Sequence, residues 1–317
     1  MIHTMRNAFS IGSVRPIRRL CDNLYDRFPM ENWMKNLFLT VLALVPLLAA
    51  RGQEPITEEA YVRADSLLWV RYEQRTQELS VALRDNPDSM RAAWQVLSDT
   101  TDVANQRLAL RYAAVPSGLQ RVFMLRGHFP KDTLRAVLAR IPEPMRTSFY
   151  GDNIRRYIET RQLGEGDALQ TFPCFLPDGT PFDWKPLEGR QVLLIFGGLR
   201  CMSPGGRQYL DKLYELTLRD ELEIVVFWPS GSQEDLVRTA EHYVTAYPQV
   251  SDFLQDASPM KILYGAQATP TCFLTDKEGI IRVKSIGLAP DRFAERLPAA
   301  AEAAEAAEAI ESMKQAE

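Results

Sequence analysis

The stretch YGAQATPTCFLTDKEG, residues 264–279, says most about how this chain folds. Residues 270–274 form one candidate strand, and residues 280–286 form a second. Between the two, Asp276 and Gly279 belong to a short polar segment of the kind that closes a β-hairpin. The stretch therefore predicts two adjacent antiparallel strands.

Further back along the chain, residues 191–196 and 222–228 form continuous apolar runs. Such runs are typical of strands that are buried on both faces, in a sheet covered by helices. Helical spacing of apolar residues follows each of them, over residues 206–219 and 232–243. An earlier hairpin is predicted over residues 172–182, around a Pro-Asp-Gly turn. This order of hairpins, strands and helices predicts an α/β fold.

The preceding residues show a helical pattern instead. Tyr61, Ala64 and Leu68 recur at three- and four-residue spacing, and Asn86 with the following proline marks the end of one helix and the start of the next. We expect a series of short helices that form an all-α domain over residues 53–163. The Ala/Glu-rich tail, residues 298–317, is expected to be a helix that extends into solvent.

Composition excludes several classes of function. The chain has 317 residues, of which 46% are hydrophobic and 25% charged, as in an average soluble protein of one large or two ordinary domains. Its 37 basic and 41 acidic residues nearly balance, so no nucleic-acid partner is expected. The three histidines and four cysteines show no zinc-ligand spacing, and no nucleotide-binding glycine motif occurs. We therefore expect no metal and no cofactor.

The N-terminal residues 1–52 resemble an extension followed by a secretory signal peptide. A short basic start at Met34 precedes an apolar run over residues 37–50, and small residues allow a cut before Gln53. The run is shorter than the ~20 apolar residues of a membrane span. We expect the true start at Met34, export of the mature protein and membrane contact only through this segment. A disordered or loosely helical extension is the alternative.

Several stretches in the second half carry a resemblance to a known family. They read GDALQTFP (166–173), LPDG (176–179) and LEGR (187–190), followed by the opening stretch 264–279. Through them, residues 164–297 resemble the thioredoxin-like superfamily, in particular the exported TlpA-like thiol–disulfide oxidoreductases related to the alkyl hydroperoxide reductase/thiol-specific antioxidant proteins. The resemblance implies a central mixed sheet flanked by helices, placed after the all-α domain. It also implies a periplasmic or cell-envelope location, with protein or small-molecule thiols and disulfides as partners.

Cys201 is the candidate nucleophile. It follows the predicted strand 191–196 and precedes a predicted helix, which places it at or near a helix N-terminus. Free N–H groups and the helix dipole there stabilise a thiolate, and Arg200 beside it adds positive charge. A thiolate is the attacking species in disulfide exchange. By resemblance, Thr269 and Pro270 form the cis-proline loop that lies against the reactive cysteine and binds the backbone of a substrate.

The sequence departs from the family at its cysteine pair. Family members read W-C-x-x-C, whereas residues 200–204 read RCMSP, so the tryptophan and the second cysteine are missing. A single thiolate attacks a disulfide but needs a second thiol to leave the mixed disulfide. That thiol is either external or the possible resolving cysteine Cys272. Strand alternation can instead point Cys272 into the core, and the sequence favours this position because free cysteines are commonly buried.

Two other functions stay open on the sequence alone. One is a redox-inactive thioredoxin-like module that binds polypeptide partners, with Cys201 as a packing residue. The other is a peroxidase, which by resemblance needs a threonine or serine three residues before the reactive cysteine, where this chain has Gly198. The sequence therefore favours thiol–disulfide exchange through one cysteine.

Overall fold

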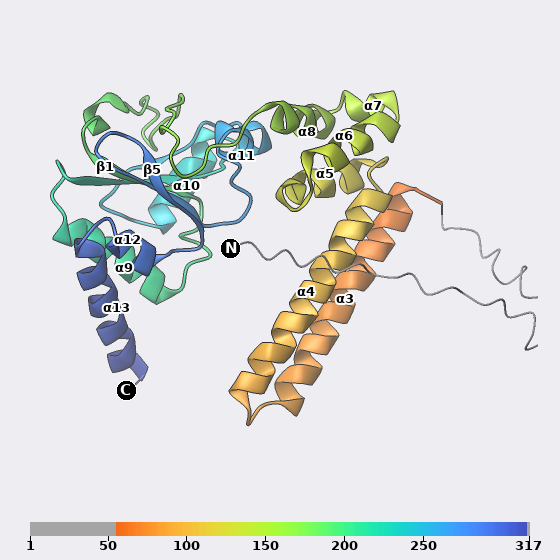
Figure 1. The fold of residues 1–317 in the computed structure, drawn as a ribbon, viewed down its shortest axis with the longest axis horizontal. Helices are drawn as coiled ribbons and strands as arrows, with labels where there is room; N and C mark the ends of the chain where they lie inside the picture. The colour runs from red at the N-terminus through yellow and green to blue at the C-terminus, as the bar shows by residue number, and fades with distance from the viewer. Residues whose placement is uncertain (1–54, 316–317) are drawn as a thin grey trace, which may run out of the picture. The chain divides into compact units, whose positions relative to one another are not determined.

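The computed structural model describes residues 55–315 of the chain. The predicted signal peptide, the start at Met34 and the cut before Gln53 lie outside the described residues. Ile56–Glu317 form one compact unit, in which a helical region precedes an α/β region (Figure 1). Within residues 55–315, no helix is both long enough and apolar enough to cross a membrane.

The helical region begins with two long helices that shorter ones follow. In chain order its elements are α3 (Glu58–Ala82), α4 (Pro87–Arg111), α5 (Pro116–Met124), η1 (Arg126–His128), α6 (Lys131–Arg140), α7 (Glu143–Arg146) and α8 (Phe149–Glu159). The expectation of short helices is wrong for α3 and α4, which have 25 residues each. Neither contains glycine, or proline after its first residue, so nothing ends them earlier. Asn86 does separate them as predicted, since its side chain accepts a hydrogen bond from the Ser89 N–H.

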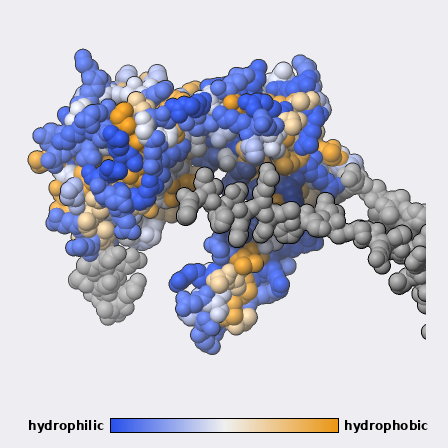
Figure 2. Space-filling view, viewed as in Figure 1, coloured by the Kyte–Doolittle hydropathy of each residue, from blue (hydrophilic) through white to orange (hydrophobic). Residues whose placement is uncertain are grey.

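The core of the helical region lies among α5, α6 and α8. Phe123, Leu134 and Ile154 are fully buried in it. Ile262, from the α/β region, belongs to the same cluster and is 4% exposed. Large hydrophobic residues remain exposed on α3 and α4, among them Val81 and Val96, while much of the face shown in Figure 2 is hydrophilic.

The α/β region is built on one mixed sheet of order β3-β2-β1-β4-β5. Its strands are β1 (Gln191–Phe196), β2 (Leu222–Phe227), β3 (Gln249–Val250), β4 (Thr271–Thr275) and β5 (Ile281–Ile286). Its helices are η2 (Lys185–Leu187), α9 (Pro204–Leu216), α10 (Gln233–His242), η3 (Gln255–Ala257), α11 (Pro259–Ile262), α12 (Pro290–Ala294) and α13 (Ala299–Gln315). β1, β2 and β3 pair in parallel, and β4 pairs antiparallel with both β1 and β5. This is the thioredoxin-like α/β fold that the sequence predicted.

Alternate residues of each strand enter different cores, one on each face of the sheet. Leu193 and Cys272 face the core formed with α9, α10, α12 and α13. Leu194 and Phe273 face the core formed with Tyr264 and the residues around it. Burial on both faces explains why β1 and β2 are continuous apolar runs.

The first predicted hairpin, over residues 172–182, is present in a short form: Phe175 bridges Pro181 antiparallel, and the Phe182 N–H donates to the carbonyl oxygen of Cys174 at 2.9 Å, but neither arm is a strand of the sheet. One expectation, about the tail, is corrected. The tail is not a solvated extension along its first turns. Ala300 and Ala303 are fully buried and Ala307 is 7% exposed, packed in the core that α9 also lines. Small side chains at this spacing form one face of a helix that can approach its neighbour closely.

Candidate functional site

Cys201 lies in the turn between β1 and α9, and its side chain is exposed. The backbone N–H groups of Cys201 and Met202 both donate to the carbonyl oxygen of Gly198, each at 2.8 Å. From α9, Nη1 of Arg207 donates to the carbonyl oxygens of Leu199 and Met202, at 3.1 and 2.9 Å. The turn that carries the sulfur is therefore fixed from both of its ends.

The loop before β4 reaches the same sulfur. The Thr269–Pro270 peptide bond is cis. The hydroxyl of Thr269 donates a hydrogen bond to Sγ of Cys201 at 3.5 Å. Pro270 approaches Gly198 so closely that a Cβ at position 198 would lie 2.5 Å from the Cβ of Pro270. The structure thus brings Cys201, Thr269 and Pro270 together, although 68 residues separate Cys201 from Thr269.

The helix N-terminus is less close to Cys201 than the sequence suggested. α9 begins at Pro204, and Ser203 is its N-cap, with a side chain that accepts from the Gly206 N–H. Cys201 therefore precedes the cap by two residues, and the helix dipole falls off within about one turn. In this geometry the direct polar contact of the sulfur is the Thr269 hydroxyl, with the helix terminus farther away.

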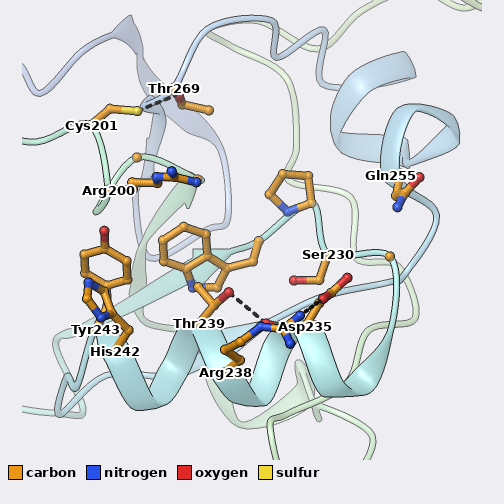
Figure 3. A pocket seen from close by; sticks show the side chains of 15 residues that line it. Arg200, Cys201, Ser230, Asp235, Arg238, Thr239, His242, Tyr243, Gln255 and Thr269 are labelled. Carbon is orange, nitrogen blue, oxygen red and sulfur yellow. Dashed lines mark hydrogen bonds and ion pairs between the residues drawn. The ribbon is translucent and has the colours of Figure 1, made fainter.

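A cavity of about 580 Å³ opens on one side of Cys201 (Figure 3). Arg200, the second predicted catalytic residue, is exposed and lines it. Much of the remaining polar and aromatic lining comes from the residues after β2 and from α10 and its C-cap, including Trp228, Ser230, Asp235, Arg238, His242 and Tyr243. Arg238 is ion-paired with Asp235. Since the basic residues in the lining outnumber Asp235, the cavity suits ligands with negative charge.

A second cavity, of about 550 Å³, opens on the other side of Cys201. Its lining contains no basic residue and includes Asp291 beside Met202, Tyr209 and Leu288, together with alanines of α13. The Tyr209 hydroxyl is buried and has no hydrogen-bond partner among the described residues. Cys201 lines both cavities, so a ligand extended across the sulfur would meet a basic pocket on one side and a pocket without basic residues on the other.

Cys174 and Cys272, the other cysteines among the described residues, are free and buried. Cys272 is 0% exposed within the core beneath α9, and burial raises the pKa of its thiol to about 12. Burial likewise raises the pKa of the Cys174 thiol to about 12. A buried neutral thiol does not attack a mixed disulfide at neutral pH. Of the two interpretations of Cys272, the structure favours the packing residue over the resolving one.

Sequence reasoning missed the wall of the first cavity. Trp228 directly follows β2, and β1 and β2 run parallel, so their carboxyl ends meet at one edge of the sheet. Residues after one strand therefore lie beside residues after the other. This rule, applied to the two apolar runs, would have placed Trp228 and the following residues next to Cys201.

No family model matches the chain, and no curated protein matches it. Among solved structures, it is similar to the thioredoxin domain of a thiol-disulfide oxidoreductase from Bacteroides vulgatus, with 21% identity and a TM-score of 0.38 over 43% of this chain and 97% of that one. A thiol-disulfide oxidoreductase from Bacteroides fragilis matches at 17% identity and TM-score 0.36, over 42% and 98% of the two chains. A thioredoxin-like protein from Parabacteroides distasonis matches at 18% identity and TM-score 0.34, over 44% and 98%. The chemistry proposed below rests on the site's own residues.

Proposed function

We propose that this protein is an exported thiol–disulfide oxidoreductase of the TlpA-like type that acts through Cys201 in the periplasm or cell envelope. The observation that carries the proposal is an exposed sulfur, held in a fixed turn and hydrogen-bonded by the Thr269 hydroxyl at 3.5 Å. Disulfide exchange needs a sulfur that a substrate disulfide can reach, and the exposed Cys201 meets this requirement.

The reaction proceeds by two exchange steps. The Cys201 thiolate attacks one sulfur of a substrate disulfide, forms a mixed disulfide with it and releases the other sulfur as a thiolate. An external thiol then attacks the sulfur of the substrate in that mixed disulfide and releases the Cys201 thiolate. One disulfide is consumed and another is formed, so Cys201 ends in its starting redox state and the external thiol is oxidised.

The surrounding residues have separate roles in these steps. Arg200 attracts anionic thiols and disulfides into the basic cavity by its charge. Thr269, which is exposed, donates to the sulfur, and its segment lies beside Cys201 where an extended substrate would bind. The need for an external thiol follows from the burial of Cys272 and Cys174.

A peroxidase is not favoured by the backbone at position 198. Gly198 has φ +98°, a conformation that non-glycine residues avoid, and a Cβ there would collide with Pro270. A hydroxyl side chain three residues before Cys201 therefore has no room in this turn.

The proposal is tested with wild type, Cys201→Ser and the matched control Cys272→Ala. Iodoacetamide should alkylate the exposed Cys201 of the folded protein and leave the buried Cys174 and Cys272 unmodified. Cys201→Ser should abolish thiol-dependent reduction of a mixed peptide–glutathione disulfide, and Cys272→Ala should preserve it. A Cys201 that is not alkylated, or reduction unchanged in Cys201→Ser, would leave the redox-inactive binding module. N-terminal sequencing of the protein exported by a bacterial host tests export, with Gln53 as the expected first residue.

A further inference from the structure

We propose that the helical region positions the Thr269–Pro270 loop against Cys201, with Arg126 as the positioning residue. The expected effect on catalysis rests on the proposed function, whereas the positioning of the loop does not. On this inference, the helical region contributes to the site around Cys201 in the α/β region.

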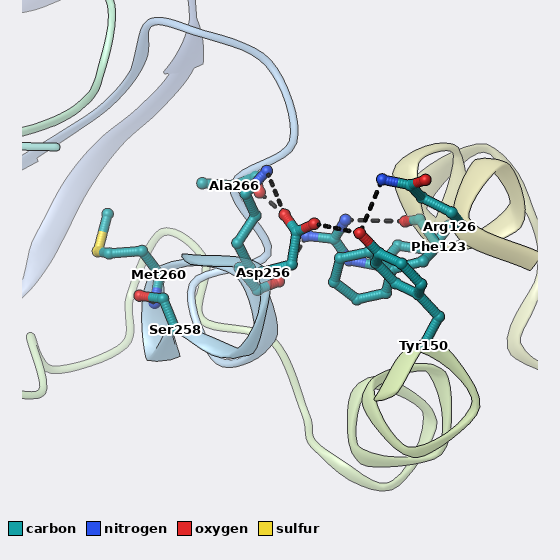
Figure 4. A network of polar contacts seen from close by, with 9 residues as sticks. Phe123, Arg126, Tyr150, Asp256, Ser258, Met260 and Ala266 are labelled. Carbon is teal, nitrogen blue, oxygen red and sulfur yellow. Dashed lines mark hydrogen bonds and ion pairs between the residues drawn. The ribbon is translucent and has the colours of Figure 1, made fainter. Parts of the chain in front are cut away.

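Arg126 is a buried cation that binds backbone. It lies in η1 of the helical region, is 0% exposed, and its guanidinium lies over the Phe123 ring at 4.3 Å. Nη1 donates to the carbonyl oxygen of Phe123 at 2.9 Å, and Nη2 donates to the carbonyl oxygens of Lys261 and Ala266 at 2.7 and 3.0 Å (Figure 4). One side chain therefore ties the helical region to both ends of the segment 261–266.

Burying an arginine costs the free energy of desolvating its charge, which the contacts of the guanidinium have to offset. Burial without a bound carboxylate disfavours the charged form and lowers the pKa of Arg126 to about 10, yet the group stays protonated at neutral pH. An apolar side chain of similar length would avoid this desolvation. It would, however, leave the carbonyl oxygens of Phe123, Lys261 and Ala266 without this donor. The planar guanidinium satisfies all of them in one fixed geometry.

A second contact continues from Arg126 toward the loop. The N–H of Gly127 donates to Oε1 of Gln267 at 2.9 Å. The contact is close, since a Cβ on Gly127 would lie 1.6 Å from Nε2 of Gln267 and would force the Gln267 side chain to move. Gln267 precedes Thr269 by two residues, and Thr269 donates to Cys201. The path from the helical region to the reactive sulfur thus runs through a few consecutive residues.

The base of the same segment is anchored by α8 and by the connection that follows it. Tyr150 donates to Oδ2 of Asp256 at 3.0 Å, and the buried Lys261 pairs with the same carboxylate at 3.4 Å (Figure 4). The N–H of Leu163 donates to the carbonyl oxygen of Leu263 at 2.9 Å. Ile262 inserts into the core of the helical region. The segment from η3 to Gln267 is therefore packed against the helical region along its length.

The inference predicts that loosening these contacts weakens substrate binding at a distance. Variants Arg126→Met, Arg126→Lys and Gln267→Ala are compared with Arg146→Met, which changes an exposed arginine of α7. Steady-state reduction of a peptide disulfide gives kcat and KM, iodoacetamide alkylation over pH reports on Cys201, and thermal melting reports on the fold. All rates are taken well below each melting temperature.

Displacing catalytic groups by about 1 Å can cost a factor of up to about 100 in rate. We therefore expect Arg126→Met to raise KM about tenfold or more and to change the rate at which Cys201 is alkylated. Arg126→Lys, which keeps a cation able to reach carbonyl oxygens, should recover part of the effect. Gln267→Ala should raise KM with little change in melting temperature, so it decides the matter if Arg126→Met does not fold. Arg146→Met should match wild type.

The inference is contradicted if Gln267→Ala and a folded Arg126→Met both keep the wild-type KM and the wild-type alkylation of Cys201. This holds whatever their melting temperatures are. Failure of the proposed function reads differently. If Cys201→Ser keeps full exchange activity, hydrogen–deuterium exchange of residues 266–271 still reports positioning, and faster exchange in Gln267→Ala than in Arg146→Met supports the contact on its own.

Discussion

Gly198→Ala is the substitution that tests most directly how the site is assembled. Gly198 has φ +98°, and an ideal Cβ on it would lie 2.5 Å from Cβ, 2.8 Å from Cα and 3.0 Å from N of Pro270. These atoms belong to a ring and a backbone, so no flexible side chain can move aside. The loop that carries Thr269 would have to withdraw from Cys201.

The size of the effect follows from two costs. A non-glycine residue held in a sparsely populated backbone region costs about 1–3 kcal/mol. Overpacking by one methyl group at a tight contact costs about 1–3 kcal/mol more. Gly166→Ala is the matched control, because Gly166 has φ +90° and no atom within 4 Å of an added Cβ. The control carries the backbone cost alone, so the difference between the two variants isolates the contact with Pro270.

Urea unfolding of both variants measures these free energies, and alkylation and exchange rates of Cys201 measure the site. Gly198→Ala should lose about 1–3 kcal/mol more stability than Gly166→Ala, or keep stability and lose exchange activity because the loop has moved. Gly166→Ala should retain wild-type activity. Equal stability of the two variants together with full exchange activity in Gly198→Ala would refute the role of this close approach.

Further predictions concern the remaining site residues and the acid stability. Cys272→Ala should keep multiple-turnover exchange with an external thiol, and loss of turnover would restore its resolving role. Arg200→Ala should slow reaction with a dianionic aromatic disulfide by about three- to tenfold at low salt and not with a neutral one, and equal slowing would contradict charge attraction. Hydrogen bonds from Arg161 and the Gly164 N–H hold the pKa of Asp167 below its ordinary value, so its stabilisation is present above about pH 3.9 and is lost as pH falls through the folded-state pKa. Asp167→Asn should therefore flatten the fall in melting temperature below about pH 4, and an unchanged acid profile would argue against this pair.

The strands could be predicted from sequence because the sheet is covered on both faces. β1 coincides with the apolar run 191–196, and β2 ends one residue before the predicted limit. β3 has only two residues and exists through its pairing with β2, so no local pattern marks it. The buried face of α13 was missed for a related reason. Alanine is a good helix former on any face, and only the partner helix decides which alanines are buried.

The site residues, like the strands, were predictable where a local sequence pattern marks them and not where only distant contacts do. Cys201, Thr269 and Pro270 were recognisable because each belongs to a local motif beside a strong strand. Arg126 was not, since 135 residues separate it from Lys261 and an arginine in a helical segment is ordinarily a surface residue. Its role depends on the carbonyl oxygens of Lys261 and Ala266, which lie far along the chain.

The arrangement around Cys201 bears on how a one-cysteine site turns over. With Cys174 and Cys272 buried, the thiol that releases Cys201 from the mixed disulfide has to be external, and it has to reach the substrate's sulfur while the substrate is still attached to Cys201. That thiol and the substrate need separate approaches, and cavities open on both sides of the sulfur. A polypeptide lying along Thr269 and the second cavity would leave the basic cavity beside Arg200 for an anionic thiol. An enzyme with a second reactive cysteine has no need of the second approach. In the proposed exchange reaction, the dependence on an external thiol and the open basic cavity are therefore two parts of one mechanism.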